Sequence, residues 1–147
     1  MRTSDILAGL VSEALVRAQA EGTLPAAGET EVVIEKPQVA EFGDFSTSLP
    51  LKLARAMRMP PMEIAKRVAS ALTPHPIVGK SSIAAPGFIN FTLADPWLRE
   101  QVNVIRRAGR TYGDVDTGKR QKVQVEFVSI NPTGPLHVGH ARGAVNG

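Results

Sequence analysis

Residues 123–140 constrain this chain more than any other segment, because a strand pattern leads through a Pro/Gly loop to two histidines. Residues 123–129 are rich in β-branched and aromatic side chains and alternate in a way that predicts a strand. Pro132 and Pro135 exclude regular structure in the loop, so a helix should begin near His137. The segment therefore predicts a strand, a loop and a helix N-terminus in succession.

The two histidines of this segment, His137 and His140, are three residues apart and should share one helix face. Free backbone N–H groups and the positive end of the helix dipole favour an anion at a helix N-terminus, most naturally a phosphate. Gly139 has no Cβ and should leave room beside the imidazoles for a flat base or a ribose. The alternative is an ordinary helix start with two solvated histidines.

The run His137, Val138, Gly139 and His140 resembles the first signature of the class I aminoacyl-tRNA synthetases, named HIGH after its residues. The longer run of residues 126–143 is similar, more narrowly, to arginyl-tRNA synthetases. The resemblance implies that arginine reacts with ATP to give arginyl-adenylate and is then transferred to tRNA(Arg). It implies ATP as a substrate together with Mg²⁺, and arginine and tRNA(Arg) as partners.

The resemblance also implies roles for single residues of the signature segment. The implied ATP site consists of His137, Gly139 and His140, with the two histidines as catalytic residues. The implied arginine site consists of Glu126, Ser129, Asn131 and His137. Glu126 is the candidate for selecting arginine, because a carboxylate is the natural bidentate partner of a guanidinium and strand ends bind ligands in α/β sheets. The alternative for Glu126 is a solvent-facing strand residue. No metal-ligating residue is expected.

The residues before the signature predict an α+β fold. Helical spacing of apolar residues predicts four helices, and the expected boundaries are Thr3 or Ser4 to Gly22, 49–57, 61–72 and 95–109. Strands are expected at residues 31–36, 82–85 and 88–93, with Pro86 and Gly87 forming a hairpin turn, and residues 41–47 are expected to form a loop. We expect N-terminal helices packed on a small, mostly antiparallel sheet, followed by the first strand and signature loop of a truncated Rossmann-like catalytic domain.

Residues 42–47 and 86–91 resemble the extra N-terminal domain that arginyl-tRNA synthetases carry. The resemblance implies a tRNA-recognition domain at residues 1–112, and a linker plus the start of the catalytic domain at residues 113–147. It implies that Phe88 and Asn90 contact the D-loop corner of the tRNA. An aromatic that stacks on a base and an amide that reads its edge suit a single-stranded loop. The alternatives are a core residue for Phe88 and a strand residue facing water for Asn90.

Composition sets outer limits on function. The chain is 43% hydrophobic and 21% charged, which excludes disorder, and it has no cysteine, which excludes disulfides and thiolate metal sites. No run of about 18 apolar residues exists, so we expect no membrane association and a cytoplasmic location. The net charge is +3, and basic residues cluster at Arg106, Arg107, Arg110 and 119–122. This cluster indicates either a phosphate-backbone contact or a helix C-terminus followed by a solvated linker.

The chain ends at Gly147, before the second class I signature (KMSKS) and the anticodon-binding domain that the resemblance implies. We therefore expect a fragment of a longer, monomeric enzyme, inactive alone and able to associate through the edges of the strand at residues 123–129. Two alternatives stay open. One is a free-standing RNA-binding module, and the other is a nucleotidylyltransferase that shares the HxGH phosphate site.

Overall fold

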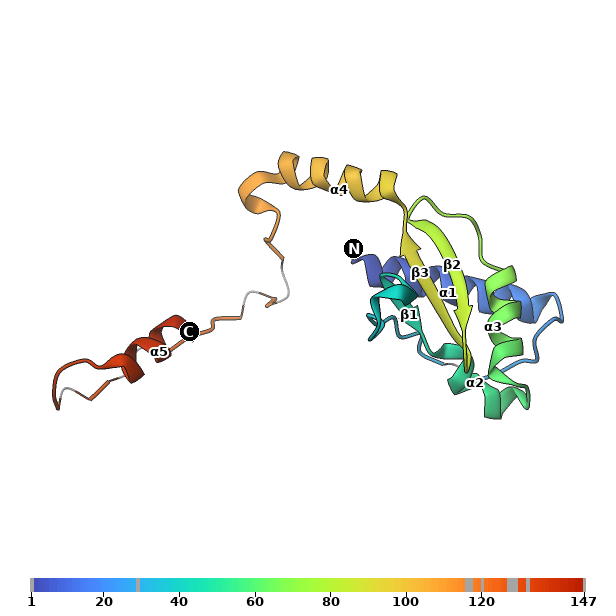
Figure 1. Cartoon of the computed structure of the whole chain (residues 1–147), viewed down its shortest axis with the longest axis horizontal. Helices are drawn as coiled ribbons and strands as arrows, with labels where there is room; N and C mark the ends of the chain where they lie inside the picture. The colour runs from blue at the N-terminus through green and yellow to red at the C-terminus, as the bar shows by residue number, and fades with distance from the viewer. Residues whose placement is uncertain are drawn as a thin grey trace. The chain divides into compact units, whose positions relative to one another are not determined.

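The computed structural model describes residues 2–28, 30–115, 118–119, 121–126, 130–131 and 133–146. The chain divides into two compact units, Met1–Gly109 and Arg110–Gly147. The elements of the first unit are α1 (Thr3–Ala20), η1 (Ala40–Phe42), β1 (Phe45–Thr47), α2 (Leu49–Met57), α3 (Pro61–Ser70), β2 (Val78–Ala84), β3 (Phe88–Leu93) and α4 (Asp95–Ala108). They are followed by η2 (Gly109–Thr111) and, in the second unit, α5 (Val138–Asn146) (Figure 1).

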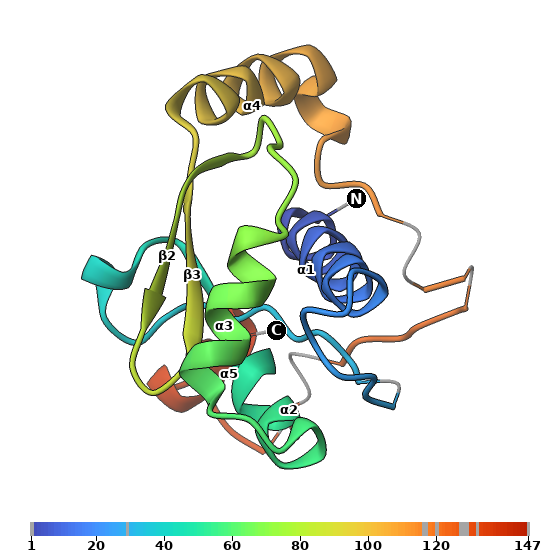
Figure 2. The same ribbon diagram turned by 90° about the vertical axis from the view of Figure 1, so that its right-hand side faces the viewer.

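A three-stranded antiparallel sheet organises the first unit, with β3 between β1 and β2. Ile89 and Phe91 of β3 are fully buried, and they face the helices, whereas Phe88 and Asn90 point to the opposite side as the period of a strand requires. Figure 2 shows α1 and α3 on one side of the β2–β3 hairpin and the cyan segment around η1 on the other. The expected α+β fold, with helices on a small antiparallel sheet, is confirmed.

The hydrophobic core lies between the sheet and the helices. Its buried members outside the sheet come from α1, the following turn, α2, α3 and the residue before β2: Leu7, Val11, Ala14, Leu15, Ala18, Leu24, Leu49, Leu53, Met57, Ile64, Ala65, Val68 and Ile77. These positions recur at helical spacing, which is the pattern that predicted the helices. By contrast, α4 has no buried residue, and its apolar residues Leu98, Val102 and Ile105 are 41%, 56% and 43% exposed.

The local predictions and the observed elements agree where a signal lies within one element. The helix at residues 49–57 and the strand at residues 88–93 have the expected bounds. The strand expected at residues 82–85 begins earlier, at Val78, because β3 offers backbone partners along its whole length. Helix α4 begins at Asp95, as expected, with Ala94 as its cap residue, and it ends at Ala108, one residue before the expected end.

Two predictions for the first half of the chain were wrong. The expected loop at residues 41–47 contains β1, whose three residues pair with β3. The expected strand at residues 31–36 is reduced to one bridge between Glu35 and Ser46. In both cases the state of the segment depends on a backbone partner distant in sequence, which residue preferences do not encode.

Two glycines allow close backbone packing around the sheet. Gly43 has a φ of +95°, and a Cβ there would lie 2.7 Å from the Phe91 carbonyl oxygen. Gly87 has a φ of +153°, and a Cβ there would lie 2.6 Å from Cβ of Pro61. The turn between β2 and β3 therefore lies directly against the first residue of α3.

The second unit contains α5 but lacks the expected strand in the part that is described. Residues 121–126 have no regular secondary structure, and Val123 and Val125 are 77% and 63% exposed. A strand is stable only when neighbouring strands satisfy its backbone groups, and no described segment pairs with this one. Residues 127–129 lie outside the described residues. In the described portion of the chain, no helix is long and apolar enough to cross a membrane.

Candidate functional site

A recess of about 340 Å³ lies on the sheet face that the helices leave uncovered. We call it the sheet recess, and its lining residues are Glu35, Lys36, Pro37, Gln38, Val39, Phe42, Ser46, Ala84, Ala85, Phe88 and Asn90. The two residues predicted to contact tRNA, Phe88 and Asn90, thus lie together in it. The wall formed by residues 35–39 and Phe42 was not predicted as part of a site. The only sequence signal for it was the motif at residues 42–47.

Small residues lie opposite Phe88 and Asn90 on the neighbouring strands. Asn90 lies opposite Ser46 of β1 and Ser82 of β2, and Phe88 lies opposite Ala84. Directly opposed residues of antiparallel strands share a face, so these short side chains leave space above the sheet. Phe88 is half-buried and lies outside the core cluster of the described residues. The core alternative for Phe88 therefore does not hold.

Asn90 is 3% exposed, which excludes a strand residue facing open water. None of the hydrogen bonds among the described residues involves its side-chain amide. Both amide atoms keep some contact with solvent through the recess, because no fully enclosed polar side-chain atom of the described residues lacks a partner. A primary amide offers two donors and an acceptor, so the floor of the recess presents a polar group that a ligand can pair with.

In the second unit, the two signature histidines stack at the start of α5. Their ring centroids are 3.7 Å apart and their planes meet at 26°. His137 precedes the helix, and its Nδ1 accepts a hydrogen bond from the backbone N–H of Gly139 at 3.2 Å. Nδ1 of His140 accepts one from the backbone N–H of His137 at 3.3 Å. The expected helix start near His137 is confirmed.

These hydrogen bonds decide which ring nitrogens carry protons. A neutral imidazole has one donor and one acceptor nitrogen, and here both Nδ1 atoms accept. Because Nδ1 accepts in both rings, Nε2 is the nitrogen of His137 and of His140 that is left to donate to a ligand. A Cβ at Gly139 would lie 3.0 Å from the His137 ring, so this glycine makes room for that imidazole itself.

A pocket of about 390 Å³ opens beside the histidines, and Asn131, Gly134, His137 and His140 are among its lining residues. The structure thus brings together three of the predicted site residues, Asn131, His137 and His140. Glu126 is exposed and does not line this pocket. Ser129 lies outside the described residues. No group of three His, Cys, Asp or Glu side chains that could hold a metal ion occurs among the residues described.

The basic residues near the end of α4 behave as a helix terminus. Arg106 and Arg107 lie in its last turn, where cations complement the helix dipole. Arg107 also pairs with Glu100 on the same helix. Hydrogen bonds from Asn103 and then Arg107 hold the pKa of the Glu100 carboxyl below its usual value. The Arg107 charge is therefore paired within α4.

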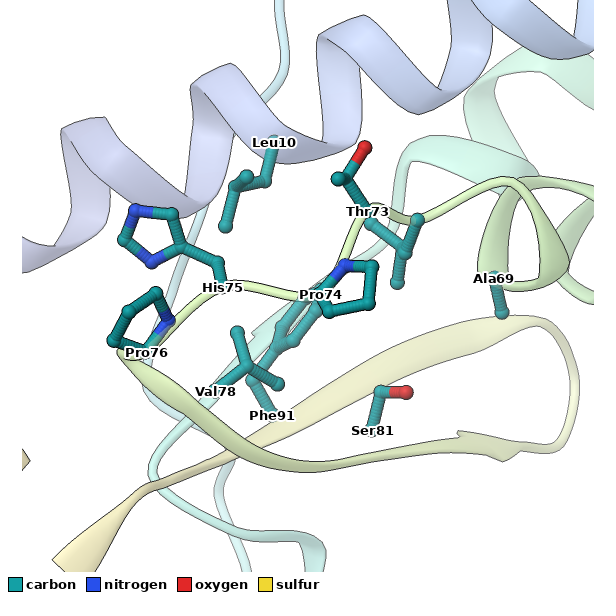
Figure 3. A pocket seen from close by; sticks show the side chains of 10 residues that line it. Leu10, Ala69, Thr73, Pro74, His75, Pro76, Val78, Ser81 and Phe91 are labelled. Atoms are coloured by element: carbon teal, nitrogen blue, oxygen red, sulfur yellow. The ribbon is translucent and has the colours of Figure 1, made fainter. Parts of the chain in front are cut away.

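A further pocket, of about 500 Å³, lies between α1, the end of α3 and β2, and its lining includes Leu10, Leu72, Pro74, Val78 and Phe91 (Figure 3). Its walls are mainly apolar, and His75, Thr73 and Ser81 supply polar side chains. His75 is half-buried, and its Nδ1 accepts a hydrogen bond from the backbone N–H of Ile77 at 3.2 Å. This imidazole therefore accepts a hydrogen bond within the loop before β2.

Comparison with known proteins identifies the family. Residues 5–93 match the family model described as "Arginyl tRNA synthetase N terminal domain". The chain belongs to the arginyl-tRNA synthetase family. Its first unit is thus the N-terminal domain of this family, and the sheet recess lies within the matched residues.

Curated relatives support the same family over nearly the whole chain. The arginine–tRNA ligase of Dehalococcoides mccartyi (strain CBDB1) is 45% identical over 143 residues, which are 97% of this chain and 26% of the relative. The arginine–tRNA ligase of Ruegeria pomeroyi is 46% identical over 140 residues, 95% of this chain and 24% of the relative. The chain spans about a quarter of the length of these synthetases.

Two solved synthetases show the same fold. Thermus thermophilus arginyl-tRNA synthetase is 26% identical, with a TM-score of 0.51, and the match covers 97% of this chain and 21% of that one. Arginyl-tRNA synthetase from Plasmodium falciparum is 9% identical, with a TM-score of 0.56 over 67% of this chain and 17% of that one. The second likeness concerns the fold alone.

Proposed function

We propose that this chain serves the arginine–tRNA ligase reaction, in which arginine and ATP form arginyl-adenylate and arginine is then transferred to tRNA(Arg). The N-terminal unit contacts the tRNA at its D-loop corner, and the signature segment belongs to the adenylate-forming site. The observation that carries this proposal is the sheet recess within the family-matched residues, where Phe88 and Asn90 meet. The substrates ATP, arginine and tRNA(Arg) follow from the family.

The sheet recess has the chemistry that a single-stranded loop base requires. Phe88 offers an aromatic face on which a base can stack, and stacking of this kind contributes about 1–3 kcal/mol per base. Asn90 offers an amide without a protein partner, which can donate to and accept from the edge of the same base. A base that enters the recess would replace water on the Asn90 amide. The hydrogen bonds between the amide and the base would then compensate for the water that both groups lose.

The test is the affinity of tRNA(Arg) for Asn90→Ala and Phe88→Ala variants, measured by fluorescence anisotropy. Each substitution should weaken binding by about tenfold, since it removes a base contact of about 1–3 kcal/mol. Ser82→Ala is the matched control, because Ser82 lies opposite Asn90 but does not line the recess. Circular dichroism establishes that the variants remain folded. Wild-type affinity in both variants would overturn the assignment.

The signature segment suits the activation of arginine by ATP. Two Nε2–H groups beside a helix N-terminus can donate to phosphate oxygens, while the backbone N–H groups and the helix dipole add positive potential. The arginine carboxylate would attack the α-phosphorus in line, so the residues act by positioning and by neutralising charge on the phosphate oxygens. His137, Gly139 and His140 form this ATP site, with both histidines catalytic. Glu126, Ser129 and Asn131 complete the arginine site with His137.

Magnesium is the remaining component that the family implies. In the described part of the chain, no group of three acidic, histidine or cysteine side chains fits this ion. The imidazole and backbone donors at the start of α5 would supply this chain's own contribution to neutralising phosphate charge.

A further inference from the structure

The turn between α2 and α3 contains a non-glycine residue in a left-handed conformation. Arg58, which follows the last residue of α2, has φ 51° and ψ 40°. The next N–H, of Met59, bonds to the carbonyl of Ala54 at 3.1 Å, which completes a Schellman motif. Glycine is favoured at this position, because a Cβ raises the energy of the left-handed region. Side chains kept in such conformations are frequently functional.

The α2–α3 hairpin also differs in charge from the preceding chain. Residues 49–70 contain five basic residues and one acidic residue, whereas residues 1–48 contain three basic and eight acidic residues. The one acidic side chain, Glu63, lies 3.6 Å from the amino group of Lys66 and 3.8 Å from the guanidinium of Arg67. The hairpin therefore carries a local excess of positive charge.

Three exposed cations of this hairpin are free of protein partners. Lys52, Arg55 and Arg58 form no ion pair or side-chain hydrogen bond with any residue that the structure describes. Lys52 and Arg55 lie on the face of α2 opposite its buried residues Leu53 and Met57. Since each keeps its hydration and a flexible side chain, each can pair with an incoming anion.

These cations adjoin the sheet recess. The β2–β3 turn lies against Pro61, where a Cβ on Gly87 would come within 2.6 Å, and Pro61 is three residues after Arg58. Ala85 and Phe88, on either side of this turn, line the recess. Figures 1 and 2 both show the α2–α3 connection at the turn end of the β2–β3 hairpin. The α2–α3 turn that carries Arg58 therefore lies beside the β2–β3 turn, and Ala85 and Phe88 of this turn region line the recess.

We propose that Lys52, Arg55 and Arg58 bind the sugar–phosphate backbone of the tRNA loop whose base enters the sheet recess, an inference that rests on the proposed function. In this arrangement, the phosphates that flank a base in the recess run over the β2–β3 turn toward the α2–α3 turn, which Gly87 and Pro61 bring together. Guanidinium groups pair with phosphate oxygens through two parallel hydrogen bonds, and each such contact releases condensed counterions. The recess then reads the base while the α2–α3 turn supplies salt-dependent affinity.

The experiment measures tRNA(Arg) binding by the 147-residue chain from low to high KCl for Lys52→Gln, Arg55→Gln and Arg58→Gly. Each substitution should lower affinity about three- to tenfold and reduce the slope of log K against log salt by about 0.7–0.9, as expected for one lost phosphate contact. Arg58→Gly should at the same time raise the melting temperature, because glycine relieves the left-handed strain. A higher melting temperature together with weaker tRNA binding would show that the Arg58 side chain contacts tRNA and does not merely stabilise the fold.

Lys80→Gln is the matched control. Lys80 is an exposed lysine of β2 near the strand end remote from the Gly87 turn, so its removal should leave the salt slope unchanged. An unchanged slope in all three test variants would overturn the proposal. The proposal would also be overturned if the three test variants lost as much affinity for poly-glutamate as for tRNA(Arg), because the surface would then fit an acidic protein.

The outcomes also separate this inference from the proposed function. Failure of the recess shows as wild-type tRNA affinity in Asn90→Ala and Phe88→Ala. Failure of the α2–α3 surface shows as an unchanged salt slope in variants whose recess is intact. If base substitutions in the D-loop weaken binding to wild type and to Arg58→Gly by the same factor, the two contacts are independent, and the assignment of Arg58 to backbone phosphates is supported.

Discussion

The carboxylate of Asp44 accepts a 2.8 Å hydrogen bond from the backbone N–H of Leu93, a residue 49 positions later in the sequence. The backbone N–H of Asp44 in turn donates to the Phe91 carbonyl at 2.9 Å. These two bonds extend the three-residue pairing of β1 with β3. Asp44 thus holds one edge of the sheet whose outer face forms the sheet recess.

Asp44→Ala should lower the free energy of unfolding by about 1 kcal/mol, because the Leu93 N–H loses a charged acceptor at a partly exposed site. Urea denaturation measures the change. Glu41→Ala is the control, since Glu41 is an exposed carboxylate of the same segment with no side-chain partner among the described residues. Equal midpoints for the two variants would show that the Asp44 bond contributes nothing.

Gly43→Ala should destabilise the first unit by about 2–4 kcal/mol, because the left-handed backbone and a contact with a strand carbonyl both oppose a Cβ. Gly9→Ala should have the opposite effect on the stability of the first unit. Gly9 lies inside α1, where a Cβ would meet nothing within 4 Å, so alanine should stabilise the unit by about 0.5–1 kcal/mol. Thermal unfolding checks both, and a destabilised Gly9→Ala would contradict the packing of α1.

His140→Ala should lower the single-turnover rate of arginyl-adenylate formation about tenfold to a thousandfold in the synthetase that contains this sequence. The reason is the loss of one Nε2–H donor to the ATP phosphates, and the fold should remain stable because His140 is not part of the core. His75→Ala is the control, since this imidazole belongs to the first unit. An unchanged rate for His140→Ala would remove the histidine from the site.

Glu126→Gln should lower kcat/KM for arginine in the same enzyme, because the substrate guanidinium loses its charged partner. The corresponding loss of transition-state stabilisation should be about 2–4 kcal/mol. The change keeps the shape of the side chain. Steady-state ATP–pyrophosphate exchange at varied arginine measures it, with Gln124→Ala as the control for a neighbouring exposed residue. A wild-type kcat/KM would make Glu126 an ordinary surface residue.

Deletion of residues 113–147 should leave the cooperative unfolding of the remaining chain intact. The core cluster lies wholly within residues 7–91, so the shortened chain keeps every buried contact of that cluster. Differential scanning calorimetry measures the transition. A loss of cooperativity would show that the predicted domain boundary is wrong, and the retained affinity for tRNA would show how much binding belongs to residues 1–112.

Local signals explain which parts of the fold were predictable. The apolar spacing and Pro50 near the start of α2 predict a helix from residues that contact one another within a few turns. The hairpin was predictable in the same way, from β-branched and aromatic residues around Pro86 and Gly87. The positions of His137 and His140 at a helix start also followed from the prolines before them.

Tertiary structure alone decided the elements and contacts that depend on distant partners. β1 exists because β3 supplies its hydrogen bonds, and residues 121–126 form no strand because no described segment supplies them. Asn90 is almost fully buried at the bottom of the sheet recess, because residues 35–42 lie over that side of the sheet. The alternation of residues along the strand could not show this covering segment. Helix propensity and turn chemistry act between neighbours in sequence, whereas strand pairing and recess formation require the chain to bring remote segments together.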